Sequence, residues 1–353
     1  MKTKKQNELP LPGEGVPETT VERAKRILNL MQPITSLPVV SEFLKSKRLH
    51  HSAGSWEELR ENRVIPALRS QKVTLEDLNQ QLAEVEEFGR SHTFLYTATK
   101  HDAARLLDRS HIENICEKLG ITSALRDVII EELPERPTIT QIREETCDGH
   151  HAWVFKVVEK REEKTFVGET TDGDRFRKEW KIGFERAVNV AKLHATGLLE
   201  IRIQSHISSS RYEADIKEMW VILSNFLPAN KFAELSLRKA KYRLWDKRDS
   251  LKTKIRFCDS TMRNNIGSTI IASTGAETAD LFEDSSIGPS LDRFLQNGAY
   301  CDSSNIWFRP FDGAINREIH VLLLGRNNEF AVTGSCTRNE YEYVLNELRA
   351  NNR

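Results

Sequence analysis

The chain has few cysteines, and their spacing fits neither a disulfide framework nor a zinc site. Its 353 residues contain five, namely Cys116, Cys147, Cys258, Cys301 and Cys336, with no Cys-x-x-Cys pair among them. An odd number of widely spaced cysteines favours reduced thiols, which are typical of compartments inside the cell. We therefore expect a cytoplasmic or nuclear protein.

The sequence also lacks long apolar runs and any excess of one charge. No segment approaches the roughly 20 apolar residues that a membrane span needs, and the N-terminal residues lack the apolar stretch of a secretory signal. Lysine plus arginine and aspartate plus glutamate both total 52, so the formal net charge is zero. We expect no membrane partner, and the composition excludes a uniformly basic coat as well as an acidic solvating polymer.

The motifs of the common enzyme classes are missing. The sequence has no Gly-x-x-x-x-Gly-Lys-Ser/Thr loop, no Gly-x-Gly-x-x-Gly, no His-Glu-x-x-His and no Gly-x-Ser-x-Gly. Cys147, His150 and His151 lie close in sequence, but a tetrahedral zinc site needs a fourth ligand, and no spaced pair supplies it. We therefore predict no cofactor and no metal, and the absences favour a protein without catalytic activity.

The first part of the chain is predicted to be helical. Residues 1–18 form a polar tail that we expect to be flexible, and from Thr19 apolar residues recur at helical spacing. Ser55 to Glu58 and Thr74 to Asp77 each place a hydroxyl three residues before a carboxylate, which is typical of a helix start. Pro134 and Pro137 mark a linker. We expect a helical domain over 19–146.

Beyond this linker the pattern changes to that of strands, as in residues 153–158, 180–184 and 319–324. The predicted fold class is α+β, with an all-helical N-terminal domain and a mainly antiparallel β-sheet domain over 147–353 whose helices pack on one side. Two stretches resemble each other, because Ser210 to Glu213 and Thr337 to Glu340 are capping boxes that each follow two strands and open a helix. Two interpretations follow: the domain consists of two related β-β-α halves, or the recurrence of this unit is a coincidence.

The neutral total conceals a basic segment over residues 231–263, where eleven basic residues stand against four acidic ones, a net charge of +7. Lysine and arginine displace the counterions of a nucleic acid, and aromatic rings offer faces for base stacking. The alternative is a solvated helix that turns its apolar residues to the core. The predicted nucleic-acid-binding residues are Lys239, Lys241, Tyr242, Arg243, Trp245, Lys247, Arg248, Lys252 and Lys254.

Two other functions are compatible with the sequence. Asp174, Glu179 and Lys181 follow the Asp, Glu-x-Lys pattern of metal-dependent nucleases, in which carboxylates hold Mg²⁺ and a lysine helps to position the attacking water. An ordinary charged hairpin explains the same residues. The third hypothesis is a protein-protein interaction scaffold whose helical domain offers the partner surface.

Residues 57–100, with Val73-Thr-Leu-Glu-Asp-Leu78 and Ser91-His-Thr-Phe-Leu-Tyr96, precede His151-Ala-Trp-Val-Phe-Lys-Val157 and residues 187–223. This order of features resembles the CENP-N family of kinetochore proteins. The resemblance implies a helical N-terminal domain, a short link and a curved β-sheet domain with helices. Members of that family bind a centromeric nucleosome through protein and DNA contacts and are not enzymes, so the resemblance implies nucleic-acid and protein partners.

Overall fold

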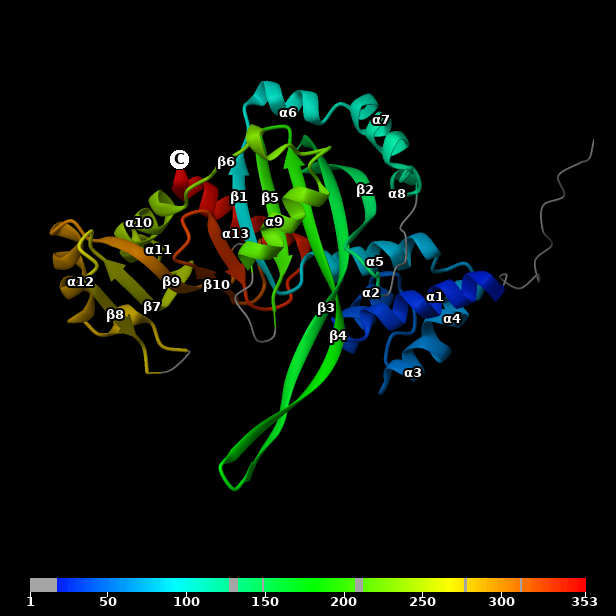
Figure 1. Cartoon of the computed structure of the whole chain (residues 1–353), viewed down its shortest axis with the longest axis horizontal. Coiled ribbons are helices and arrows are strands. Elements are labelled where there is room, and N and C mark those ends of the chain that lie inside the picture. Colours follow the sequence, from blue (N-terminus) through cyan, green and yellow to red (C-terminus); the bar gives the residue numbers. More distant parts are fainter. Residues whose placement is uncertain (1–17, 127–132, 148, 207–211, 276–277, 312) are drawn as a thin grey trace, which may run out of the picture. The chain divides into compact units, whose positions relative to one another are not determined.

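Figure 1 shows the computed structural model of the chain, which describes residues 18–126, 133–147, 149–206, 212–275, 278–311 and 313–353. These residues form a mixed α/β structure with a large antiparallel sheet. The chain divides into two compact units, Met1–Glu86 and Glu87–Arg353. The expected tail over 1–18 lies outside the described residues except for its last residue. Among the described helices, none has the length and apolar character needed to cross a membrane.

The described residues of the first unit include several helices, which are joined by turns and loops. Its elements are α1 (Glu18–Met31), α2 (Leu37–Ser46), α3 (Trp56–Leu59), the π-helical turn η1 (Arg60–Val64), α4 (Ile65–Arg69) and α5 (Leu75–Glu87). In α1 the residues Ala24, Ile27 and Leu28 recur at helical spacing and are buried. The Ser55 hydroxyl accepts the Glu58 N–H at 3.1 Å, which confirms the predicted start of α3.

The expected helical region over 19–146 also contains two strands, which corrects the predicted boundary. These are β1 (Ser91–Thr97) and β2 (Thr138–Cys147), and between them lie α6 (Lys100–Leu106), α7 (Arg109–Leu119) and α8 (Ser123–Arg126). Residues 93–96 of β1 are buried on both faces of the strand. A short, fully buried strand has no alternation of polar and apolar residues, so its pattern cannot be distinguished from that of a helix segment.

Within the described residues, eleven strands form one sheet. Besides β1 and β2 they are β3 (His150–Asp172), β4 (Arg175–His194), β5 (Leu198–Gln204), β6 (Ala233–Glu234), β7 (Ile255–Arg263), β8 (Thr269–Ser273), β9 (Tyr300–Phe308), β10 (Ile319–Leu323) and β11 (Glu329–Val332). The order is β2-β3-β4-β5-β1-β11-β10-β9-β7-β8, and β6 pairs with β1. Strand β1 pairs antiparallel with both β5 and β11. It therefore joins the two halves of the sheet, which are β2 to β5 on one side and β7 to β11 on the other.

Helices cover both faces of this sheet, and the prediction that they pack on one side is wrong. On one face the His92 ring stacks on Tyr212 of α9 (Tyr212–Ile222) at 3.7 Å. On the opposite face Thr93 Oγ1 lies 3.1 Å from the Tyr341 hydroxyl of α13 (Arg338–Asn352). Successive residues of a strand point to opposite faces, so neighbours in β1 contact different helices.

The remaining helices lie mainly beside strands β7 and β9. They are η2 (Ala229–Lys231), α10 (Arg238–Asp246), α11 (Arg248–Leu251), η3 (Leu281–Glu283) and α12 (Ile287–Gln296). The capping box at Thr337 and Glu340 is present at the start of α13. Ser210 of the other proposed box lies outside the described residues. Each of α9 and α13 follows an antiparallel pair, β4 with β5 and β10 with β11.

Strands β3 and β4 continue beyond the sheet as a two-stranded ribbon, residues 159–186, which we call the long hairpin (Figure 1). Pairing of β2 with β3 stops at Thr138 and Val158, and pairing of β5 with β4 stops at Val190 and Arg202. Past these points the two strands pair with each other, and the described residues place no third strand beside them.

Buried charges connect the sheet to α13. Glu200 of β5 accepts a hydrogen bond from the Tyr341 hydroxyl at 2.7 Å, and its other oxygen lies 2.5 Å from His194 Nε2. The Arg202 guanidinium contacts the rings of both Phe88 and Tyr341, at 4.9 and 5.0 Å from their centroids. Burial raises the pKa of Glu200, but the His194 hydrogen bond and the charge of Arg202 outweigh it and lower this pKa to about 2.

A second part of this network surrounds Glu87 and Glu145. Arg143 donates to Glu87 Oε2 and to Glu145 Oε1, both at 2.6 Å, and Arg338 of α13 donates to Glu145 Oε2 at 2.8 Å. Burial raises the pKa of Glu87, but the charges of Arg143 and Lys156 outweigh it and lower this pKa to about 2. Both carboxylates are therefore held in the ionised form by the fold.

We expect the chain to lose stability as the pH falls from 4.5 toward about 2. The pKa values of Glu87 and Glu200 are lowered from 4.5 to about 2 in the folded chain, so their contribution is complete above pH 4.5 and is lost as they protonate. Urea midpoints measured over this range test the expectation, and Glu200→Gln should flatten part of the decline. A midpoint independent of pH across the range would contradict it.

Candidate nucleic-acid interface

Helix α10 lies within the predicted basic segment over residues 231–263 and is amphipathic. Leu237, Ala240 and Leu244 are buried, at positions i, i+3 and i+7. Its first turn is capped by another helix, because the Ala240 N–H donates to Asn352 Oδ1 at 3.0 Å. The same periodicity places residues 241, 245 and 248 on the inner side and residues 239, 242 and 243 on the outer side.

Lys241 lies on the inner side and is only 3 % exposed, so it cannot serve as a phosphate ligand in this conformation. Its ammonium group donates to the carbonyl oxygens of Asp302 at 2.7 Å and of Leu324. Burial lowers the pKa of this lysine. The residue instead joins α10 to strand β9 and to the residue that follows β10, which corrects its predicted role.

Trp245 is also internal, which corrects its prediction as a stacking residue. Its side chain is 1 % exposed, and its indole N–H donates to Asp292 Oδ1 at 2.8 Å. The Arg248 guanidinium donates to Asp292 Oδ2 at 2.5 Å and lies 5.1 Å from the Trp245 ring. Trp245 has no free ring face, and the charge of Arg248 is already compensated.

Two further cations of the predicted interface already make contacts within the chain. Arg243 is half-buried and donates to the main-chain carbonyl of Arg353. Lys254 is half-buried, and its ammonium lies 3.9 Å from the centroid of the Phe311 ring. Both retain their charge, but neither side chain is free to follow a phosphate backbone without breaking these contacts.

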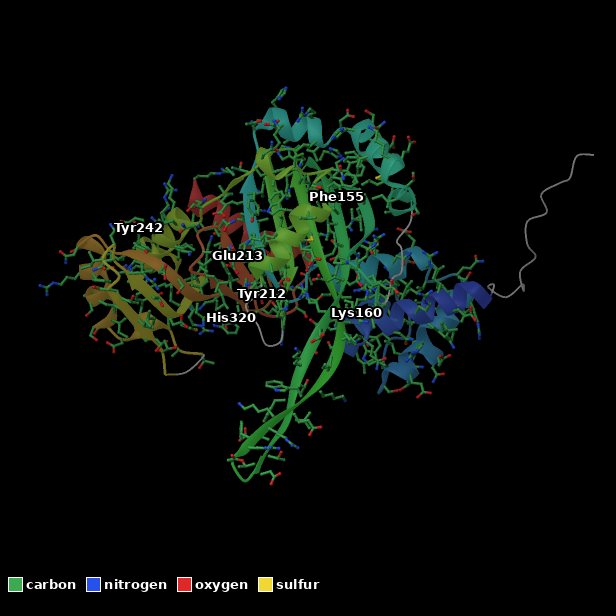
Figure 2. The ribbon with its side chains drawn as sticks, in the orientation of Figure 1. Phe155, Lys160, Tyr212, Glu213, Tyr242 and His320 are labelled. Atoms are coloured by element: carbon green, nitrogen blue, oxygen red, sulfur yellow. The ribbon has the colours of Figure 1, made fainter. Side chains whose placement is uncertain are left out.

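The structure leaves Lys239, Lys247 and Lys252 exposed, and no carboxylate of the described residues lies within ion-pair distance of them. Tyr242, labelled on α10 in Figure 2, is 52 % exposed. Arg238 is exposed as well and lies 4.6 Å from the Tyr300 ring. We call the following residues the α10–α11 basic face: Arg238, Lys239, Tyr242, Arg243, Lys247 and Lys252. Only two acidic residues, Asp246 and Asp249, occur between its ends.

The residues of the nuclease hypothesis do not come together. Asp174 lies in the turn of the long hairpin, whereas Glu179 and Lys181 lie further along β4, and all three are exposed. Five residues of extended chain separate Asp174 from Glu179, about 17 Å at the usual rise per residue, whereas carboxylates that share one metal ion bind it at about 2 Å. The arrangement is that of a charged hairpin.

No group of three His, Cys, Asp or Glu residues in the described parts of the chain could hold a metal ion. His150 and His151 are exposed at the start of β3, and His151 Nε2 lies 3.4 Å from Glu144 Oε1. The side chain of Cys147 is outside the described residues.

The sequence-based prediction missed the apolar face of the long hairpin. Phe176, Trp180 and Ile182 alternate with charged residues in β4 and are about half exposed. This alternation indicated a strand with one apolar face, but it did not show whether a core covers that face. Comparison with protein-family models and with curated proteins found no match to the chain.

Proposed function

We propose that this chain is a non-catalytic, nucleic-acid-binding adaptor that contacts phosphates through the α10–α11 basic face. The observation that carries the proposal is the exposure of Lys239, Lys247 and Lys252, unpaired with any described carboxylate, together with the half-exposed ring of Tyr242. Exposed, unpaired ammonium groups can replace condensed counterions on a nucleic acid without first breaking an internal ion pair.

The composition of this face supports phosphate contact more than base-specific recognition. Its five cations outnumber Asp246 and Asp249 and give a net charge of +3. Tyr242 offers one ring for stacking against a base or sugar. We expect a moderate, salt-dependent affinity with little sequence preference, because contacts to phosphate position a protein but carry no sequence information.

The proposal includes the finer organisation of the chain. We propose that the helical unit and the β-rich unit are separate domains, that the protein acts in the cytoplasm or the nucleus, and that it is related to the CENP-N family. The division into a helical first unit and a β-rich second unit supports separate domains. The four cysteines whose side chains are described are free thiols, which supports a location inside the cell. Protein partners belong to the same proposal.

Titration of fluorescein-labelled duplex DNA with the full chain tests the proposed function. We expect the logarithm of the affinity to fall linearly with the logarithm of the salt concentration, with a slope of about −3 to −5 for three to five phosphate contacts. The same titration with single-stranded DNA and with RNA establishes the preferred nucleic acid. Binding that is undetectable at low salt, or that does not change with salt, would overturn the proposal.

A further inference from the structure

The long hairpin exposes an apolar surface that no described part of the chain covers. Phe166, Phe176, Trp180, Ile182 and Phe184 are between 46 % and 57 % exposed. Their register places them together, because Phe166 pairs with Trp180, with ring centroids 5.3 Å apart, and residues 176, 180, 182 and 184 lie on alternate positions of β4. Exposed apolar side chains gathered on one face mark a surface for binding another molecule.

The main-chain edge beside this face is also unpaired. Strand β5 pairs with β4 between Val190 and Leu193 and ends at Gln204, so the described strands leave residues 175–186 of β4 without a neighbour on that side. Such an edge presents N–H and C=O groups to which an extended segment can add as a new strand. The added strand would continue the position that β5 occupies nearer the sheet.

The charge of the two strands distinguishes their edges. Residues 175–186 of β4 contain five basic and two acidic residues, a net charge of +3, whereas residues 159–172 of β3 contain three basic and five acidic residues, a net charge of −2. Three of the β4 cations, Arg175, Arg177 and Lys181, occupy odd positions, so they lie on the face opposite the apolar residues. The acidic side chains of a strand that alternates with apolar residues would point to that same face. The edge of β4 therefore suits an acidic segment.

The size of the face argues against a second copy of this chain. A ribbon of two strands and about 13 residues is about 40 Å long and about 10 Å wide, or about 400 Å². Two such faces would bury about 800 Å² in total, below the roughly 1,200 Å² of a stable interface. Strand addition needs less area, because main-chain hydrogen bonds supply part of the affinity.

We propose that the long hairpin is a docking site for an extended segment of a partner protein in which apolar residues alternate with acidic ones. This segment pairs with the free edge of β4 along residues 175–186, and its apolar side chains extend the row formed by Phe176, Trp180, Ile182 and Phe184. Its carboxylates lie near the cations of β4. The site is separate from the α10–α11 basic face, so the adaptor holds a nucleic acid and a protein at different surfaces.

A designed peptide tests this proposal with the full-length chain. The probe is a fluorescein-labelled peptide of twelve residues in which Val, Ile and Phe alternate with Asp and Glu, and its control has Lys at every acidic position. We expect Trp180→Thr combined with Ile182→Thr to weaken binding of the acidic peptide by about tenfold or more, because two large apolar contacts are lost. Thr165→Ser combined with Thr170→Ser, on the other face of β3, should leave it unchanged.

Hydrogen exchange then locates the peptide. Amides of residues 175–186 should exchange more slowly in its presence, and those of residues 159–172 should not. Equal binding of the acidic and lysine peptides, no binding to the unaltered chain, or protection along β3 would overturn the proposal. So would a dimer in sedimentation that the Trp180→Thr/Ile182→Thr variant abolishes, since the occupant would then be a second copy.

Discussion

Replacement of Lys239, Lys247 and Lys252 by glutamate is expected to weaken the binding of duplex DNA by about two orders of magnitude at physiological salt. Each of these ammonium groups is exposed and unpaired with any described carboxylate, so each is available to a phosphate. Loss of three phosphate contacts removes the counterion release that each provides, and the introduced carboxylates repel the backbone. Fluorescence anisotropy of a labelled duplex measures the change.

A matched control separates this local effect from a general effect of charge. Lys72, Lys100 and Lys118 are exposed elsewhere on the chain, and their replacement by glutamate produces the same change in net charge. The control variant should bind duplex DNA within about threefold of the unaltered chain, because distant charges are screened beyond about 10 Å. Equal losses in the two variants would show that the α10–α11 basic face has no special role.

Glu200→Ala is expected to lower the free energy of unfolding by about 3 to 5 kcal/mol. The change removes the acceptor of the Tyr341 hydroxyl and a carboxylate that lies 3.9 Å from Arg202 Nε. Arg202 is 2 % exposed, so its charge would stay buried with less compensation. Urea unfolding measures the loss, and Glu117→Ala, at an exposed position of α7, should change stability by less than about 0.5 kcal/mol. A Glu200→Ala loss below about 1 kcal/mol would contradict the assigned role.

Helical periodicity contained more information about α10 than the count of its charges. The spacing that directs Leu237 and Leu244 inward also directs Lys241 and Trp245 inward. Composition treats Lys239 and Lys241 as equivalent, but the periodicity assigns them to opposite sides of the helix. What the sequence could not reveal is that main-chain carbonyls of Asp302 in β9 and of Leu324 after β10 would accept from the Lys241 ammonium, because both residues are distant in the sequence.

Strand β1 shows a different limit. The helices of the first unit and most strands of the second follow from local patterns, but β1 is short and buried on both faces. Its position in the centre of the sheet depends on pairing with β5 and β11, more than 100 and 230 residues away in sequence. The burial of Glu87 and Glu200 depends on the same long-range pairing, so local sequence patterns do not show that these charges form an internal network.

The difference in salt dependence between the unaltered chain and the Lys239→Glu/Lys247→Glu/Lys252→Glu variant tests the central claim most directly. Each phosphate contact contributes about 0.9 to the slope of log affinity against log salt, so the variant should have a slope smaller by about 2.7. Equal slopes for the two proteins would contradict the claim, because they would place the phosphate contacts at other residues.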